Sequence, residues 1–317
     1  MNGPLVSAVM ANYNDVATIG EALDALLGQS YRNIEIIVVD DASTDDSLEV
    51  IDGIAKHDAR VQVIRHTRNA GPIHAQMTGL KRAEGDFVFV PSANDRALPG
   101  FLEKQLECLE RHVDAAVCFC DLVCLDDPDR NEFAGIAHAP VYLSAEAVVD
   151  LLSRRHAFML GGISLVKRTA LADAGWLIPE LRWMADFFAF QTVVFRHGVA
   201  HVPEALYAVR KPIYSEVGPR SAAQQEAILC LVGLLGSPEY ADVLPAFRRS
   251  GILAAVPGLL RLALRRAEHW RVLSPVQVRR ALWNEIKDGL RPLTPPSLRQ
   301  AYRRERDRWL ARISDLP

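Results

Sequence analysis

The sequence predicts an α/β protein in which a mostly parallel sheet is flanked by helices and followed by an all-helical C-terminal region. First, short β-branched apolar runs alternate with segments of helical periodicity over the first 120 residues, the pattern of a parallel-type sheet. Second, the run Ile34–Val39 is nearly all apolar, which is typical of a strand buried on both faces. Third, the chain from Ser221 onward has helical patterning.

Each element is placed by its periodicity and by the residues that flank it. We expect strands at residues 6–10, 34–39, 61–64, 87–90, 115–120 and 163–166, and one more within 200–209. We expect helices at residues 19–27, 44–54, 71–83, 99–111, 144–152, 169–174 and 183–196. Thr18, Thr44 and Ser144 are the expected N-caps, because a hydroxyl can accept a hydrogen bond from a backbone N–H of the first helical turn. Residues 121–143 are expected to be rich in loops.

Charge is distributed unevenly along the 317 residues, although the net charge is only −3. From Arg248 to the end there are 16 Lys and Arg against 6 Asp and Glu, whereas the preceding residues carry 20 against 33. We therefore expect the two parts to serve different purposes. We place one domain at residues 1–215 and a helical, basic region at residues 216–317.

Composition argues against several classes of protein. No run of 18 apolar residues exists, so no transmembrane helix is expected. The first residues lack a basic n-region, so no signal peptide is expected, and the odd number of cysteines, five, then indicates a reducing cytoplasm. The segment C-F-C-D-L-V-C at 118–124 could suggest a metal site. No His lies close to it in sequence, however, and core cysteines are the preferred interpretation.

Polar side chains gather after three of the predicted strands. Residues 12–15 (N-Y-N-D) follow the first strand, residues 40–45 (D-D-A-S-T-D) the second, and residues 92–95 (S-A-N-D) the fourth. In open α/β sheets, ligands bind outside the carboxyl ends of the strands. One such cluster would be explained by capping of the next helix, but three at one edge favour a ligand site.

Motifs spread over about residues 4–212 resemble those of family 2 glycosyltransferases. They are V-M-A-N-Y-N at 9–14, Q-S-Y at 29–31, E-I-I-V-V-D-D-A-S-T-D at 35–45, N-A-G at 69–71, A-E-G-D-F-V-F-V at 83–90, G-W at 175–176 and W-M-A-D at 183–186. The resemblance implies the Rossmann-like GT-A fold, with a nucleotide-binding half at 1–120 and an acceptor half at 121–215. It also implies transfer of a sugar from a nucleotide-activated donor to an acceptor hydroxyl, with inversion and with a divalent metal.

The resemblance also assigns a set of residues to the nucleotide-sugar donor. They are Ala11, Tyr13, Asp15, Asp41, Asp45, Asn69, Gly71, Ala93 and Asn94. Tyr13 would stack on the nucleobase, and the residue matching Asp41 reads uracil in families of this type, so a UDP-linked donor is expected. Asn69 and Gly71 match a turn whose backbone supports the donor phosphates. Packing on the next helix is the alternative for Tyr13, and a plain turn is the alternative for Asn69 and Gly71.

The loop after the fourth predicted strand departs from the family at the metal position. In the family, the motif Asp-x-Asp-Asp begins seven residues before a proline. Counting back from Pro99 aligns Ser92, Asn94 and Asp95 with the three Asp residues of that motif. The resemblance implies Mg²⁺ or Mn²⁺, with Asn94 and Asp95 as the ligands here. An Asn carbonyl oxygen can coordinate a hard cation but carries no formal charge, so the site is weakened.

The resemblance places the catalytic base at the start of a helix in the acceptor half. The family's Glu-Asp pair reads Ala185-Asp186 here, which implies that Asp186 takes the proton from the acceptor hydroxyl. Its neighbours in sequence are apolar, and a carboxylate without a role or partner would be costly there. Stabilisation of the helix N-terminus is the alternative. Trp176 and Trp183 are assigned to the acceptor as a sugar-stacking floor, with core packing as the alternative for Trp176.

The expected function is therefore inverting transfer of a sugar from a UDP-linked donor to a glycan or lipid-linked acceptor in polysaccharide biosynthesis. One alternative is metal-independent transfer with Arg96 or His74 on the phosphates. Another is a non-catalytic nucleotide-sugar-binding module that acts as a partner in a polysaccharide-assembly complex. An NAD-dependent oxidoreductase is disfavoured, because the loop after the first strand reads N-Y-N-D and not G-x-G-x-x-G.

Two basic segments dominate the C-terminal region, residues 251–271 and 296–312, and each combines an apolar face with several arginines. Helices of this kind can lie on an anionic membrane surface. Packing on the acidic domain and contact with a second copy are the alternatives. We expect a cytoplasmic protein, either peripheral at the inner face of the membrane or a homodimer, and no nucleic acid partner, because no binding motif accompanies the charge.

Overall fold

The computed structural model describes residues 3–125, 131–132, 139–154, 163–210, 222–256, 258–263 and 267–290. The chain divides into two units. The first, here called the sheet unit, comprises Met1–Ala134, Pro140–Ala145 and Phe158–Tyr214. The second, here called the helical unit, comprises Gly135–Ala139, Glu146–Ala157 and Ser215–Pro317.

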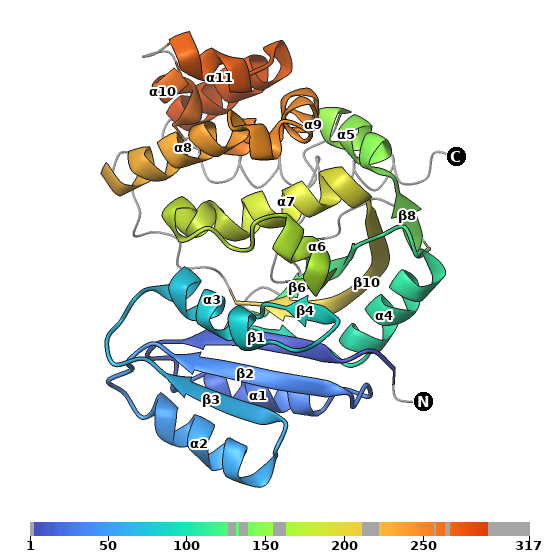
Figure 1. Ribbon diagram of the computed structural model, residues 1–317, viewed down its shortest axis with the longest axis vertical. Helices are drawn as coiled ribbons and strands as arrows, with labels where there is room; N and C mark the ends of the chain where they lie inside the picture. The colour runs from blue at the N-terminus through green and yellow to red at the C-terminus, as the bar shows by residue number, and fades with distance from the viewer. Residues whose placement is uncertain are drawn as a thin grey trace. The chain divides into compact units, whose positions relative to one another are not determined.

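The sheet unit is built on strands in the order β3-β2-β1-β4-β9-β6-β10-β5, with β7 beside β6 and β8 beside β10 (Figure 1). They are β1 (Val6–Asn12), β2 (Ile34–Asp40), β3 (Val61–Arg65), β4 (Phe87–Phe89), β5 (Arg96–Ala97), β6 (Val117–Cys124), β7 (Asn131–Glu132), β8 (Val141–Leu143), β9 (Ser164–Lys167) and β10 (Val199–Val209). β1 to β4 are parallel, as are β6 and β10. β9 runs antiparallel between β4 and β6. The predicted α/β sheet is confirmed, and its antiparallel members make it a mixed sheet.

Helices cover both faces of this sheet (Figure 1). They are α1 (Ile19–Leu27), α2 (Ser47–His57), α3 (Pro72–Arg82), α4 (Phe101–Arg111), α6 (Arg168–Asp173), the 3-10 helix η2 (Pro179–Met184) and α7 (Ala185–His197). α1 packs against α2, whereas α3 packs against β1 and β2 from the opposite side of the strands. α7 buries residues around most of its circumference, which explains why its sequence is apolar nearly all round.

The carboxyl ends of β1, β2 and β4 meet at one edge of the sheet. The parallel register pairs Asn12 with Asp40 at the ends of β1 and β2. Just beyond β4, Ser92 forms a parallel bridge with Ala11 of β1. The three polar clusters expected after these strands therefore lie at the same edge, where α/β sheets bind their ligands.

Packing explains two of the motif residues. A Cβ at Gly85 would lie 2.7 Å from the backbone nitrogen of Ser7, so a larger residue would have to displace β1. Gln29 is buried, its Nε2 donates to the carbonyl oxygen of Leu98 (3.0 Å), and its Oε1 accepts the N–H of Leu102 (3.4 Å). The Gln29 side chain thereby ties the end of α1 to the start of α4.

Three local predictions are wrong. Thr44 does not cap α2, because the helix begins three residues later and Asn14 Oδ1 accepts the Thr44 N–H instead (2.7 Å). Thr18 precedes α1, but its side chain makes no capping hydrogen bond. The α-helix expected from residue 183 begins only at Ala185, because Trp183 and Met184 belong to the 3-10 helix η2.

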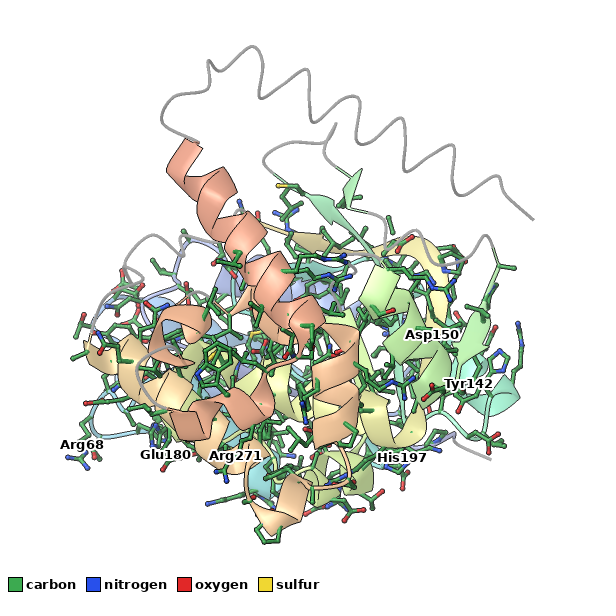
Figure 2. All side chains as sticks on the ribbon, turned by 90° about the horizontal axis from the view of Figure 1, so that it is seen from above. Arg68, Tyr142, Asp150, Glu180, His197 and Arg271 are labelled. Atoms are coloured by element: carbon green, nitrogen blue, oxygen red, sulfur yellow. The ribbon has the colours of Figure 1, made fainter. Side chains whose placement is uncertain are left out.

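The region expected to be rich in loops contains strands, because β6 continues through Cys124 and β8 follows it. The thiols of Cys118, Cys120 and Cys124 are free and buried in β6, which confirms the interpretation as core cysteines. Tyr142 on β8 donates its hydroxyl to the carbonyl oxygen of His197, the last residue of α7 (3.2 Å); Figure 2 labels both residues.

The described residues of the helical unit form α-helices and short 3-10 helices, as expected. They are α5 (Ala145–Arg154, from its second residue), α8 (Ala222–Leu235), η4 (Pro238–Tyr240), α9 (Leu244–Ser250), η5 (Ile252–Ala255), α10 (Leu259–Ala263), η6 (Ala267–Val272) and α11 (Pro275–Leu290). Arg280 joins three of them, since its guanidinium donates to the carbonyl oxygens of Leu152 (2.7 Å) and Ser250 (3.0 Å).

The basic segment 251–271 is described only in part, at residues 251–256, 258–263 and 267–271. Its described residues are divided among η5, α10 and η6. The second basic segment, residues 296–312, lies outside the described residues. Over the part of the chain that is described, no helix has the length and apolar character needed to cross a membrane.

Candidate active site

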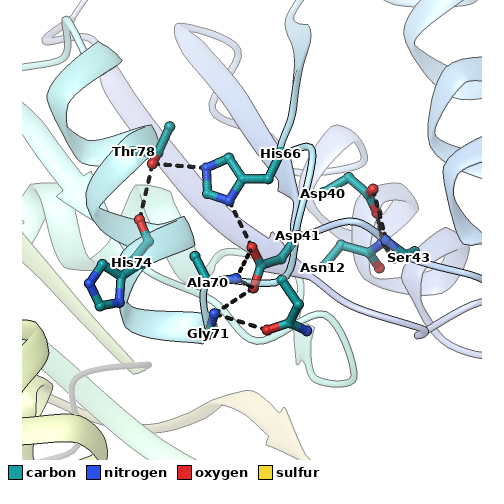
Figure 3. A network of polar contacts seen from close by, with 10 residues as sticks. Asn12, Asp40, Asp41, Ser43, His66, Ala70, Gly71, His74 and Thr78 are labelled. Carbon is teal, nitrogen blue, oxygen red and sulfur yellow. Dashed lines mark hydrogen bonds and ion pairs between the residues drawn. The ribbon is translucent and has the colours of Figure 1, made fainter.

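The first polar cluster joins the ends of β1 and β2 through Asn12 (Figure 3). Asn12 Nδ2 lies 2.7 Å from Asp40 Oδ1 and 3.0 Å from the hydroxyls of Ser43 and Ser47. Asp40 also accepts the backbone N–H of Ser43 (3.2 Å) and its hydroxyl (2.6 Å). Asn12 and Asp40 are both buried. Asp40 therefore braces the loop after β2.

A second layer of bonds fixes the loop that carries Tyr13. Asn14 has left-handed backbone (φ 57°), and its Oδ1 accepts the N–H of Thr44. Asp45 Oδ2 accepts the N–H of Val16 (3.0 Å), so the loops after β1 and β2 hold each other. Tyr13 lies between these anchor points and is 46% exposed, which leaves its ring accessible for stacking.

Two acidic side chains interact across these loops. Burial raises the pKa of Asp15, the N–H of Tyr13 opposes this rise, and the negative charge of Asp45 adds to it. For Asp45, desolvation is outweighed by hydrogen bonds from Ser47 and Val16, which together lower its pKa. Negative charge at this place suits base N–H groups or ribose hydroxyls and repels phosphate.

Asp41 is the centre of the network drawn in Figure 3. It is 2% exposed, and its Oδ1 lies 2.7 Å from His66 Nδ1 and accepts the N–H of Ala70 (2.9 Å). Its Oδ2 accepts the N–H of Gly71 (2.7 Å) and shares that of Ala70 (3.1 Å). Asp41 thus links the end of β2 to the N-terminus of α3.

The N-A-G motif forms the turn that leads into α3. Gly71 has φ 92°, a backbone conformation that favours glycine, and Asn69 Oδ1 accepts its N–H (3.0 Å). A Cβ at Gly71 would meet no atom within 4 Å, so the backbone and not crowding selects glycine. These contacts confirm that N-A-G forms a turn. A contact between this turn and the donor phosphates stays a prediction.

The loop after β4 is held by the residue that follows β10. Arg210 donates its backbone N–H to Asp95 Oδ1 (3.0 Å) and its Nε–H to the carbonyl oxygen of Asn94 (3.1 Å). Arg210 Nη2 also donates to Glu21 (2.9 Å), and Arg96 pairs with the same carboxylate. Desolvation raises the pKa of Asp95 to about 6, although the Arg210 N–H acts in the opposite direction.

Asn94 and Asp95 offer a metal one amide oxygen and one carboxylate. A divalent cation beside Asp95 would offset the desolvation that raises the pKa of its carboxyl. Among the described residues, no group of three His, Cys, Asp or Glu side chains could hold a metal by itself. The two residues therefore fit a metal that takes most of its ligands from elsewhere, as Mg²⁺ does when it binds phosphate oxygens and water.

Asp186 is the second residue of α7 and is partly exposed. Burial raises its pKa, while its Oδ1 accepts the N–H of Phe187 (2.7 Å). The 3-10 helix η2, which carries Trp183, packs against α3, the helix that begins after Gly71. The described contacts do not join Asp186 directly to Asp41 or Asp95, so their convergence on one cleft stays a prediction.

Four residues of this arrangement were not foreseen from the sequence: Glu21, His66, Thr78 and Arg210. His66 is 25 residues from Asp41 in the chain, and Arg210 is 115 residues from Asp95. Local sequence periodicity cannot predict contacts between residues that are so far apart in the chain. For Arg210 one signal exists, since it is the first charged residue after a long apolar strand.

A sheet of this order, with polar loops at the carboxyl ends of β1, β2 and β4, defines a protein of the GT-A class. The model of glycosyl transferase family 2 matches residues 7–173, more than half of the chain. The chain therefore belongs to glycosyl transferase family 2, as its motifs indicated.

Curated relatives agree with this family. An uncharacterised glycosyltransferase of Haemophilus influenzae is 39% identical over 126 residues, which cover 38% of this chain and 50% of that protein. Glycosyltransferase GlyG of Streptococcus pneumoniae is 27% identical over 172 residues, 52% of this chain and 57% of GlyG. The matches thus span about half the length of these relatives.

Solved structures show the same fold. TarS 1–349 of S. aureus in complex with UDP-GlcNAc has a TM-score of 0.63 and 16% identity, and the match covers 84% of this chain and 78% of TarS 1–349. Mannosyltransferase PcManGT of Pyrobaculum calidifontis in complex with GDP-Man and Mn²⁺ has a TM-score of 0.53 and 18% identity, with 92% and 81% covered.

Proposed function

We propose that the protein is an inverting glycosyltransferase that moves a sugar from a UDP-linked donor to a hydroxyl of a glycan or lipid-linked acceptor in polysaccharide biosynthesis. One observation carries the proposal: in a family 2 chain, the loop after β2 meets the N-terminus of α3 around the buried Asp41 carboxylate. A charged group is kept in such a place when it has a partner or a task.

The nucleobase is assigned to Tyr13 and Asp41. The exposed ring of Tyr13 offers a stacking face, and the Asp41 carboxylate can accept a hydrogen bond from a base N–H. The other donor contacts are assigned to Ala11, Asp15, Asp45, Asn69, Gly71, Ala93 and Asn94. TarS was solved with UDP-GlcNAc and PcManGT with GDP-Man, so the fold itself accommodates either base and the choice of uridine rests on Asp41.

Mg²⁺ or Mn²⁺, when bound, supplies positive charge that neutralises the departing diphosphate. Asn94 and Asp95 are the residues that would hold it. Arg210 keeps Asp95 in place through its backbone N–H and fixes the carbonyl group of Asn94. The solved complex of PcManGT with Mn²⁺ supports a metal in this fold.

Asp186 is the proposed general base. As the acceptor oxygen bonds to the anomeric carbon, its proton passes to the Asp186 carboxylate. The bond from the anomeric carbon to the donor phosphate breaks on the opposite face, so the configuration inverts. Desolvation makes this carboxylate a stronger base than an exposed Asp. The N–H of Phe187 occupies Oδ1, and we assign Oδ2 to the acceptor.

Trp176 and Trp183 are proposed to hold the acceptor. Both indoles are partly exposed, and aromatic faces pack well on the apolar faces of sugar rings. The backbone is left-handed at Trp176 (φ 60°) and at Arg182 (φ 53°), a strained conformation that residues other than glycine seldom adopt. Strain of this kind is concentrated at functional sites, which supports a role for this segment.

We further propose that the helical unit lies on the inner face of an anionic membrane, where a lipid-linked acceptor would be found. Its described residues include an apolar groove lined by Trp270, Pro275, Val278, Arg279 and Leu282. Trp270 and Leu282 are 44% and 49% exposed. Exposed Trp and Leu beside Arg271 and Arg279 combine the apolar and cationic groups that an anionic bilayer interface attracts.

A screen of nucleotide sugars by thermal shift, with and without Mn²⁺, tests the donor and the metal together. UDP-linked sugars are expected to raise the melting temperature more than GDP-linked sugars, and Mn²⁺ is expected to enlarge the shift. No shift with any nucleotide sugar would rule out the donor proposal.

The substitution Asp186→Asn tests the catalytic proposal. We expect transfer to fall by about 10²-fold to 10⁴-fold, the usual contribution of a general base, while donor affinity stays unchanged. Asp173→Asn, at an exposed carboxylate on α6, is the matched control and should leave both unchanged. Donor binding without transfer in the native protein would instead indicate the non-catalytic nucleotide-sugar-binding module.

A further inference from the structure

His66 bridges the proposed base-reading carboxylate to helix α3. It is the first residue after β3, and its backbone N–H donates to the carbonyl oxygen of Asp40 (2.9 Å). Its Nδ1 lies 2.7 Å from Asp41 Oδ1, and its Nε2 lies 3.0 Å from Thr78 Oγ1 (Figure 3). The side chain is 18% exposed, so solvent competes little with these bonds.

Both ring nitrogens of His66 are engaged, one with the Asp41 carboxylate and the other with the Thr78 hydroxyl. Thr78 Oγ1 also donates to the carbonyl oxygen of His74 within α3 (3.1 Å). The ring therefore connects the end of β2 to α3, and it cannot turn without breaking one of these two contacts.

Three donors serve the Asp41 carboxylate: the His66 ring and the N–H groups of Ala70 and Gly71, with the Ala70 N–H shared by both oxygens. Because these donors come from both ends of the connection between β3 and α3, the carboxylate has little freedom to rotate. A base N–H that replaces the longer Ala70 contact on Oδ2 (3.1 Å) would therefore meet the carboxylate in a fixed direction.

We propose that His66 is a positioning residue that determines nucleobase specificity, an inference that rests on the proposed function of Asp41. Its ring, held at the other side by Thr78, fixes the orientation of the Asp41 carboxylate, so that the carboxylate selects a base with an N–H at the matching place. A uracil ring offers such an N–H between its two carbonyl groups, whereas cytosine has no hydrogen on the corresponding ring nitrogen.

Binding of four nucleotides tests the proposal: UDP, CDP, GDP and ADP, measured by calorimetry with the full chain. His66→Phe keeps a ring of similar size but removes both ring nitrogens. We expect it to weaken UDP binding about tenfold, the effect of losing one charge-assisted hydrogen bond, and to leave CDP binding within about twofold. His66→Gln, which can still donate to Asp41, should recover most of the preference for UDP over CDP.

Two further variants keep the test decisive. Thr78→Val removes only the distal anchor and should reduce the UDP preference without abolishing it, even if His66→Phe fails to fold. His57→Phe, at an exposed histidine ending α2, is the control and should change nothing. A merely structural role for His66 would lower the melting temperature or all four affinities together, and the ratio of affinities would stay the same.

Asp41→Asn separates the possible failures. If it abolishes the UDP preference while His66→Phe and Thr78→Val keep it, the inference about His66 is wrong and the proposed base contact stands. If Asp41→Asn also keeps the preference for UDP, the proposed contact between Asp41 and the base is wrong, and the inference about His66 is wrong with it. Both are also wrong if the native chain binds none of the four nucleotides.

Discussion

Neighbouring aspartates in the D-D motif have different tasks because they face different surroundings. Asp40 is bonded to Asn12 and Ser43 and braces a loop. Asp41 is bonded to His66 and to the backbone that begins α3. Successive residues of an extended chain point to opposite sides, so Asp40 braces the loop while Asp41, the residue proposed to read the base, faces the start of α3.

The pH dependence of the transfer rate should reflect the pKa of Asp186, which its surroundings determine. Burial raises its pKa, so the acid limb of kcat/KM should lie at higher pH than an ordinary Asp, with activity lost as pH falls through that pKa. The stability effect has the opposite sign: the folded state prefers the protonated carboxyl, so ionisation at neutral pH lowers the free energy of unfolding. Asp186→Asn should therefore be at least as stable as the native chain at pH 7 and lose this advantage in acid, as urea denaturation at several pH values can show.

The substitution Asn94→Asp tests the proposed metal position. It adds the carboxylate that the family motif carries there, and we expect the apparent affinity for Mn²⁺ to rise about tenfold because carboxylate charge governs the binding of hard cations. The measurement is a titration of activity with Mn²⁺ after treatment with a chelator. His57→Asp, at the far end of α2, is the charge control. Activity that survives the chelator in both forms would instead support the metal-independent alternative.

At the scale of elements, the site depends on the ends of helices and strands. The N-terminus of α3 supplies two N–H groups to Asp41, and the end of β10 supplies one N–H to Asp95. Both carboxylates are therefore anchored by backbone that belongs to other elements. A change in backbone conformation at these ends should affect the site more than a change of side chain nearby.

Gly71→Ala and Gly53→Ala form a matched pair, because an added Cβ meets no atom within 4 Å at either position. Gly53 lies inside α2, where Ala should raise the free energy of unfolding by roughly 0.5–1 kcal/mol. Gly71 has φ 92°, so Ala there should lower it by about 1–3 kcal/mol and weaken donor binding through Asp41. Urea denaturation measures both, and equal effects at the two positions would show that backbone strain is not what selects glycine at Gly71.

At the scale of the whole molecule, the chain combines a sheet unit that carries the candidate site with a basic helical unit. The match to the family model lies mainly in the former, since it ends at residue 173. The role of the helical unit therefore has to be argued from its own surface. Its exposed Trp270 and Leu282 are the features that a partner would cover.

The substitution Trp270→Ala should weaken binding to vesicles that contain anionic lipid. Removing a half-exposed indole is expected to reduce the partition coefficient about tenfold, on the order of 1–2 kcal/mol of apolar burial. Sedimentation with anionic and with neutral vesicles measures it. Val113→Ser, at a highly exposed apolar residue of the sheet unit, is the control. No binding to either vesicle, together with concentration-dependent dimerisation lost in Trp270→Ala, would assign the surface to a second copy.

The sequence by itself determined the alternation of strands and helices, because local periodicity reports which face of each element is buried. It also determined that polar loops follow β1, β2 and β4 at one edge, because parallel strands end together. Only the tertiary structure placed β9 between β4 and β6, paired β5 with β10, and brought His66 to Asp41 and Arg210 to Asp95. Those contacts join residues far apart in the chain, where sequence spacing has no fixed relation to distance in space.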